Sequence, residues 1–131
     1  MNKVELVGMA ATEPEYGQTQ SGISRAVFRL AVQRRYKNDQ GKYDADFLTI
    51  ICWRGLADLV KMYVAKGARV AVVGAIQVRQ WEDKSGVKHT VYEIVADETE
   101  FLNSRPKDES GAGAYGPAEE SGQGFTQVDD D

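Results

Sequence analysis

The chain has 131 residues, of which 42% are apolar and 27% are charged, and its formal net charge is −4. This composition is typical of one globular domain and excludes collagen-like, coiled-coil and fully disordered chains, and no apolar run approaches the roughly 20 residues that a bilayer-spanning helix needs. A single cysteine and a single histidine also exclude most metal sites, because zinc usually takes several nitrogen or sulfur ligands, so we expect no metal and no other cofactor.

The N-terminal segment predicts a short strand over residues 4–9. Glu5 interrupts this apolar stretch, so the segment does not resemble a secretory signal peptide. One cysteine cannot form an internal disulfide, and we therefore expect a protein of the reducing cytoplasm. Residues 13–15 and 18–22 contain proline, glycine and polar side chains that are typical of turns or loops.

Apolar and polar residues alternate from Arg25 to Tyr36, which predicts a half-buried strand. The apolar face consists of Ala26, Phe28, Leu30 and Val32, and the polar face contains Arg25, Arg29, Gln33 and Arg35. A polar stretch with a glycine, residues 37–42, predicts a hairpin connection to a second strand over 46–54.

Strand 46–54 is apolar on both faces, whereas an antiparallel strand with one solvated face should alternate. One face carries Phe47, Ile51 and Trp53, and the other carries Leu48, Ile50 and Cys52. Two interpretations follow from the pattern. Either the strand is covered on both sides, or its aromatic face is a binding platform.

One helix is predicted after this strand. Its apolar positions recur at helical spacing and are Leu56, Leu59, Val60 and Tyr63. Gly67 follows where the C-terminal cap of the helix is expected.

Two further strands complete the predicted domain, over 69–81 and 88–96, with a turn at 83–86 between them. A typical strand has about 5–6 residues, so we expect the end of the first one to project as an arm that carries Arg79 and Trp81. Three strands, one helix and two strands are the order of an all-β, five-stranded oligonucleotide/oligosaccharide-binding (OB) barrel with one helix after its third strand.

Residues 105–131 differ from the rest in charge and composition. They carry seven acidic residues against two basic ones, a net charge of −5, whereas residues 1–104 carry 14 basic and 13 acidic residues, a net charge of +1. The segment has no Leu, Ile or Met, so it cannot bury enough apolar surface to offset the entropy of ordering. We therefore expect an OB domain over 1–104 and a flexible, disordered acidic tail over 105–131.

Basic and aromatic residues interleave along the predicted strands, at Arg34, Arg35, Tyr36, Lys37, Phe47, Trp53, Arg54, Arg79, Trp81 and Lys84. Single-stranded nucleic acid needs this mixture, because bases stack on aromatic rings at roughly 1–3 kcal/mol each and phosphates attract cations. From the pattern alone, Phe47 and Trp53 are as consistent with a covered core as with a binding face. The positions of Tyr36 and Trp81 favour exposure.

Short motifs follow one another along residues 2–102. They are Asn2-Lys3-Val4-Glu5-Leu6-Val7-Gly8, Pro14-Glu15, Leu30-Ala31-Val32, Arg35-Tyr36, Asp46-Phe47, Trp53-Arg54-Gly55-Leu56-Ala57, Tyr63-Val64-Ala65-Lys66-Gly67, Val73-Gly74 and Arg79-Gln80-Trp81. As a set, they resemble the bacterial and phage single-stranded DNA-binding proteins. The resemblance implies an OB fold, usually in a homotetramer, that wraps single-stranded DNA without sequence preference and protects it during replication, recombination and repair in the nucleoid.

The resemblance also implies roles for individual residues. The stacking aromatics of the family fall on Tyr36, Phe47, Trp53 and Trp81, and the first two are often tryptophan in relatives. By position and chemistry, the phosphate or sugar contacts fall on Lys3, Arg29, Arg35, Thr49, Arg54 and Arg79.

The tail of this family normally ends in acidic residues and a short apolar tip that finishes in Pro-Phe and docks on replication and repair enzymes. The present sequence carries the acids Asp129, Asp130 and Asp131 without that tip. We therefore expect such partners only where the native chain has the tip. A second hypothesis is that the acidic tail competes with DNA for the basic face.

Other functions remain open on the residues alone. One alternative is an OB adaptor of the primosome or the DNA-uptake machinery that acts mainly through protein contacts, and another is an RNA-binding or tRNA-binding OB domain. An enzyme is the least supported, because no nucleophile with an oriented partner and no set of metal ligands with a base is evident.

Overall fold

The computed structural model describes residues 1–102, and the predicted tail, residues 105–131 with Asp129, Asp130 and Asp131, lies outside the described residues. The elements are β1 (Val4–Ala10), β2 (Glu15–Gln18), β3 (Ser24–Lys37), β4 (Tyr43–Trp53), α1 (Gly55–Tyr63), β5 (Arg69–Glu82) and β6 (Lys88–Phe101). Over residues 1–102, no helix has the length and apolar character needed to cross a bilayer.

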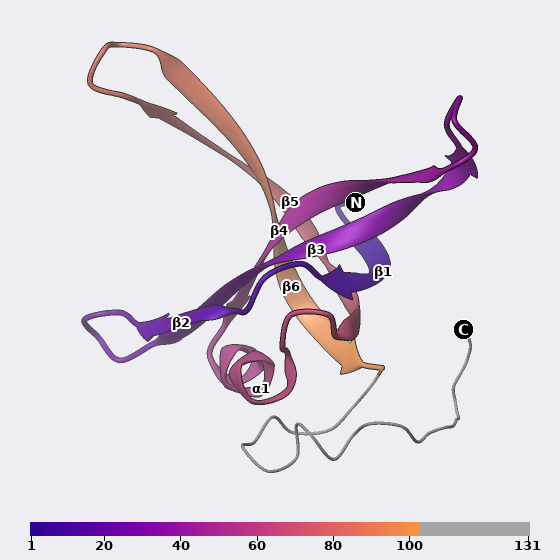
Figure 1. Ribbon diagram of the computed structural model, residues 1–131. Coiled ribbons are helices and arrows are strands. Elements are labelled where there is room, and N and C mark those ends of the chain that lie inside the picture. The colour runs from indigo at the N-terminus through magenta and orange to yellow at the C-terminus, as the bar shows by residue number, and fades with distance from the viewer. Residues whose placement is uncertain (103–131) are drawn as a thin grey trace.

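Five of the strands close into a barrel, which confirms the predicted OB fold. The sheet order is β1-β5-β6-β4-β3-β2, and an additional pairing of β1 with β3 closes the ring. Val4 pairs with Gly74 in the antiparallel β1–β5 ladder, whereas Ile50 and Ile94 are partners in the short parallel ladder of β4 and β6. The one helix of residues 1–102, α1, follows β4 and packs against β3 and β4 (Figure 1).

The buried faces of the strands and of α1 form one apolar core. It contains Ala10, Ala26, Phe28, Leu30, Ile50, Cys52, Ala57, Val60, Val64, Val70, Val72 and Ile94. The alternation in β3 is therefore confirmed, since Phe28 and Leu30 are buried while Arg25 and Arg29 are exposed. Burial of each such large side chain contributes about 1.5–3 kcal/mol.

The expectation of three strands before the helix is wrong by one strand. Glu15–Gln18 forms β2, which pairs with the first part of β3, and Glu15 lies opposite Val27. β1 also pairs with β3, through Ala10 and Leu30, so β1 and β2 lie along the same neighbour as two parts of a bent strand. Pro14 stands in the interruption, where a proline cannot donate a ladder hydrogen bond.

The predicted helix is correct, but its expected end is not. α1 ends at Tyr63, and Val64 is already extended while its N–H still bonds the Val60 carbonyl. Gly67 lies in the following turn with φ 94° and donates its N–H to the Ala10 carbonyl. This glycine therefore connects the loop to β1 and does not cap the helix.

Two long hairpins project from the barrel in different directions, one formed by β3 and β4 and the other by β5 and β6 (Figure 1). Their strands extend beyond the expected ranges, because β4 begins at Tyr43 and β6 continues to Phe101. The expected turn at the tip of the β5–β6 hairpin is confirmed. Gly86 has φ 88° there and donates its N–H to the Asp83 carbonyl.

Candidate nucleic-acid interface

One outer face runs across β3, β4 and β6. Residues that are partners across a ladder point to the same side of a sheet. Arg25 is the partner of Trp53, and Arg29 is the partner of Thr49, in the β3–β4 ladder. Thr49 is in turn the partner of Glu93 on β6. These side chains therefore share one face, opposite the face that forms the core.

The β5–β6 hairpin continues this face. Gln77 is the partner of Glu93, and Trp81 is the partner of His89. Because side chains alternate along a strand, Arg79 shares the side of Gln77 and Trp81. Four expected contact residues on two strands, Thr49 and Trp53 on β4 and Arg79 and Trp81 on β5, thus lie on one surface.

The aromatic side of β4 is exposed, which excludes the interpretation that this strand is covered on both sides. Phe47 is 54% exposed and Trp53 is 38% exposed. The neighbouring residues on the opposite side, Ile50 and Cys52, are fully buried in the core. Only Ile51, between the two aromatic positions, is covered on this face. An exposed large ring costs apolar burial, so two of them on one strand indicate a contact surface.

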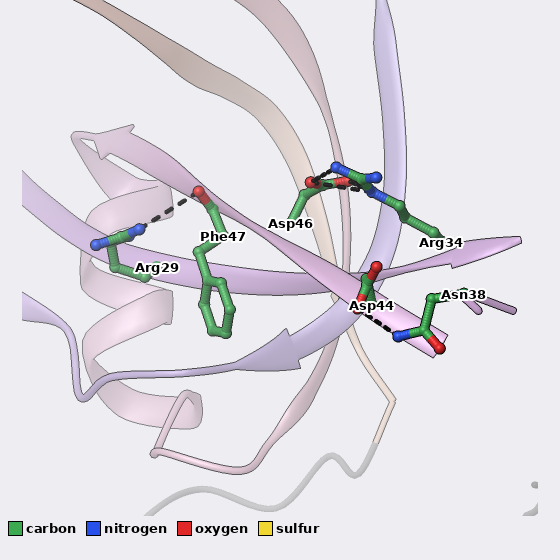
Figure 2. A network of polar contacts seen from close by, with 6 residues as sticks. All are labelled: Arg29, Arg34, Asn38, Asp44, Asp46 and Phe47. Atoms are coloured by element: carbon green, nitrogen blue, oxygen red, sulfur yellow. Dashed lines mark hydrogen bonds and ion pairs between the residues drawn. The ribbon is translucent and has the colours of Figure 1, made fainter. Parts of the chain in front are cut away.

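Guanidinium groups lie over both rings. The Arg25 guanidinium carbon is 5.6 Å from the centroid of the Trp53 ring, and that of Arg29 is 5.9 Å from the Phe47 ring. Arg29 Nη2 also donates a hydrogen bond of 3.4 Å to the Phe47 carbonyl (Figure 2). Cation–π contacts of this kind hold a positive charge beside an aromatic face. The sequence pattern left Arg25 out of the expected contacts, although its position opposite Trp53 brings it into the face.

The two expected residues of the projecting hairpin have partners within it. Arg79 Nη2 forms an ion pair of 3.0 Å with Glu93, whose carboxylate is largely buried, and the hydrogen bonds that Arg79 donates to Glu93 raise the pKa of the Arg79 guanidinium. More than half of the Arg79 side chain remains exposed. Trp81 is 46% exposed, and its ring stacks on His89, which in turn forms a bond of 2.8 Å with Asp83.

Arg34 has a structural partner and lies away from the aromatic face. Its guanidinium forms two-pronged hydrogen bonds of 2.9–3.3 Å with Asp46, and this pairing lowers the pKa of the Asp46 carboxyl. Figure 2 shows that Asp46 and its neighbour Phe47 point to opposite sides of β4. Asn38 and Asp44 form a further bond, of 3.1 Å, near the tip of the same hairpin.

Three other expected residues lie at the margins of the face. Tyr36 is 75% exposed near the end of β3, beside the exposed Arg35, after the regular β3–β4 register changes beyond Gln33. Lys3 is exposed just before β1. The structure therefore does not place these three side chains within the group formed around Phe47 and Trp53.

Arg54 is held in an unusual backbone conformation directly after Trp53. Its φ of 61° and ψ of −132° lie in a region that side chains other than glycine rarely adopt. The Arg54 N–H donates to the Ser24 carbonyl at 2.8 Å, and the Arg54 carbonyl accepts from Asp58 at the start of α1. The residue thus connects the aromatic strand to the helix, and its side chain is exposed.

Within residues 1–102, no three histidine, cysteine or carboxylate side chains lie close enough together to hold a metal ion. The single cysteine is fully buried, and burial raises the pKa of the Cys52 thiol to about 12. A thiol in this state is not a nucleophile, because nucleophilic attack needs the thiolate. The exposed face offers aromatic and cationic groups for binding.

The chain is also similar in sequence to known proteins. The profile of the Single-strand binding protein family matches residues 1–102. A single-stranded DNA-binding protein of Caldanaerobacter subterraneus subsp. tengcongensis is 41% identical over 120 residues, which cover 92% of this chain and 78% of that protein. Single-stranded DNA-binding protein 3 of Listeria innocua is 38% identical over 100% of this chain and 79% of its own length. Single-stranded DNA-binding protein 1 of Staphylococcus aureus is 37% identical over 97% and 81% of the two chains.

Proposed function

The chain belongs to the single-strand binding protein family, and we propose that it binds single-stranded DNA on the outer face of β3, β4 and the β5–β6 hairpin. The observation that carries the proposal is the exposure of Phe47 and Trp53 on one strand, each with a guanidinium over or beside its ring. A covered pair of rings would have made the face a packing surface.

The proposed mechanism combines stacking and charge. Bases stack on Phe47, Trp53 and Trp81, at roughly 1–3 kcal/mol per base. Arg29 and Arg79 contact the phosphates beside these rings, and Thr49 offers a hydroxyl to a sugar or phosphate. Every base presents a flat face, so this mode of binding implies little sequence preference. Because each phosphate contact releases a bound cation, affinity falls as salt rises.

The marginal residues extend this surface in the proposal. Tyr36 adds a stacking ring near the end of the β3–β4 hairpin, and Lys3, Arg35 and Arg54 add phosphate or sugar contacts at the edges. The exposure of all four side chains is consistent with this assignment. The adaptor alternative is not favoured, since it gives the exposed rings and their cations no task.

At the cellular level, we propose a binding protein of the cytoplasm, associated with the nucleoid, that acts as a homo-oligomer, with a tetramer as the expected state. It protects single-stranded DNA during replication, recombination and repair, and it does not transform its ligand. Incubation with Mg²⁺ and a labelled single strand should therefore leave the strand intact. Cleavage that co-purifies with the protein would contradict this part of the proposal.

The acidic segment 105–131 has a proposed regulatory role. Its acids, which include Asp129, Asp130 and Asp131, compete with DNA for the basic face, and replication or repair proteins bind the tail where the native chain has an apolar tip. Deletion of 105–131 should then tighten DNA binding at low salt. Equal affinity with and without the segment would remove the idea of competition.

The main proposal is tested by titrating the full chain with oligo-dT at two salt concentrations while tryptophan emission is recorded. The sequence has two tryptophans, so the variants Trp53→Phe and Trp81→Phe each leave one reporter. We expect quenching in both variants and weaker binding at the higher salt. A chain that is folded by circular dichroism but shows no binding at low salt would overturn the proposed function.

A further inference from the structure

A hollow of about 280 Å³ lies beside the aromatic face, at the β2–β3 hairpin. It is lined by Glu15, Tyr16, Gly17, Gln18, Thr19 and Arg25. β2 takes no part in the contacts proposed above, and Arg25, although it lies on the aromatic face, has no phosphate contact in that proposal. From this arrangement, and resting on the function proposed above, we propose that the DNA path continues past Trp53 onto β2, where the hollow receives one further nucleotide and Arg25 binds its phosphate.

Arg25 is placed to connect the two parts of this path. Its guanidinium lies 5.6 Å from the Trp53 ring, and the same side chain lines the hollow. Within the described residues 1–102 it forms no ion pair, whereas Arg34 and Arg79 are each paired with a carboxylate. An exposed guanidinium without a protein carboxylate is available for a phosphate, which it can bind through two parallel hydrogen bonds.

Gly17 keeps the hollow open. It is the ladder partner of Arg25, so it occupies the same side of the hairpin. A Cβ placed on Gly17 would have no other heavy atom within 4 Å, which shows that the space above this residue is empty. β2 is also the terminal strand of the sheet. Part of its backbone N–H and C=O groups therefore point away from β3 and can bond a base or a sugar.

Glu15 makes a second, independent prediction possible. Glu15 lines the same hollow, and its negative charge repels the phosphate that Arg25 attracts. If a nucleotide enters the hollow, Glu15→Gln should tighten binding. If the DNA ends at Trp53, this exposed substitution should leave affinity unchanged.

The test compares Arg25→Gln and Glu15→Gln with the wild-type chain in oligo-dT titrations over a range of salt. Lys66→Gln is the charge-matched control, because Lys66 is exposed in the loop after α1 and does not line the hollow. Loss of one phosphate contact on a single strand reduces the slope of log affinity against log salt by roughly 0.7. For Arg25→Gln we expect that change and roughly tenfold weaker binding at low salt.

Gly17→Leu tests the hollow itself. The φ angle of Gly17 is not positive, so a residue with a side chain can adopt its backbone conformation. The added side chain also has room, so the variant should fold and fill the hollow. In the wild type, we expect a longer oligo-dT that reaches the hollow to bind more tightly than a shorter one. In Gly17→Leu, we expect this difference in affinity to disappear. A circular dichroism melt verifies the fold.

The outcomes separate the inference from the function beneath it. The hollow is not a DNA site if the slope of log affinity against log salt is the same for Arg25→Gln and Lys66→Gln. The same conclusion follows if Gly17→Leu binds long oligomers as tightly as the wild type does. In both cases the proposed binding of single-stranded DNA by the wild type is unaffected. If the wild type binds no oligomer, the proposed function itself is wrong.

Discussion

The Trp81 indole stacks on the His89 imidazole, with ring centroids 4.3 Å apart and planes 18° from parallel. His89 also forms a bond of 2.8 Å with Asp83 in the turn at the tip of the hairpin. The turn, the imidazole and the indole are thus joined in one chain of contacts. One face of the indole rests on the imidazole, and the residue remains 46% exposed, so the ring can stack on a base without first being ordered.

Replacement of His89 by alanine should weaken DNA binding through Trp81. A stacked aromatic pair contributes about 0.5–1.5 kcal/mol, and without it the indole must be ordered when the base binds. In a Trp53→Phe background, where Trp81 is the remaining tryptophan, we expect weaker quenching by oligo-dT and lower anisotropy of the free protein. His89→Phe keeps a ring and should retain most of the affinity. Equal affinity of the alanine variant and the wild type would show that His89 does not position the indole.

The tip of the β5–β6 hairpin should respond to acid in a defined range. Hydrogen bonds from His89, Ser85 and the Val87 N–H lower the pKa of Asp83 to about 2, from an ordinary value of 3.8. A carboxyl whose folded pKa is depressed stabilises the fold above its ordinary pKa, and this contribution is lost as the pH falls through the folded pKa. The turn should therefore loosen between about pH 4 and pH 2. An NMR titration of the Asp83 carboxyl would measure the midpoint, and a midpoint near 4 would contradict the geometry.

Cys52 should be inert in the folded protein. Its side chain is fully buried opposite the aromatic face, and burial raises the pKa of the thiol to about 12. At pH 8 the thiolate fraction is then very small, and reagents also lack access to the sulfur. Iodoacetamide should not label the native chain, whereas it should label the chain in urea. Rapid labelling without urea would show that β4 opens readily.

Arg54→Gly should separate stability from binding. The φ of 61° at this position favours glycine, so the substitution relieves backbone strain, and we expect the free energy of unfolding to rise by about 1 kcal/mol. Loss of the exposed charge should weaken DNA binding in the same variant. Arg54→Lys keeps both the charge and the strain and is the matched control. Urea unfolding and oligo-dT titration report the two effects, and a less stable glycine variant would contradict the strain argument.

The spacing of apolar residues, together with the glycines and prolines of the turns, predicts most of this fold. The spacing is informative because one side of each strand is buried and therefore apolar. The alternation around Phe28 and the helical spacing around Val60 both correspond to core positions. The missing strand, Glu15–Gln18, has four residues, a glycine and a proline just before it, so its own sequence is typical of a loop. It is a strand because β3 provides a partner, and pairing between distant segments has no local signal.

The site is predicted in part for a related reason. Residue types and spacing identify Phe47 and Trp53 as candidates, but only the closed barrel decides which face of β4 is covered. The position of Arg25 over Trp53 depends on the ladder register between two strands. The sequence of either strand alone does not contain that register. From the sequence, Arg25 can therefore be interpreted only as a charged residue facing solvent.

The closure of the barrel has a consequence for biosynthesis. The Asn2 side chain exchanges two hydrogen bonds with the backbone of Ile76, which is 74 positions later, and β1 pairs along its length with β5. During translation, the first strand therefore emerges without its neighbour and has to wait until β5 has left the ribosome. Non-local pairing of this kind slows folding and leaves strand edges open to other chains. The N-terminal segment of the nascent chain is thus the part of this protein on which a chaperone would have the most effect.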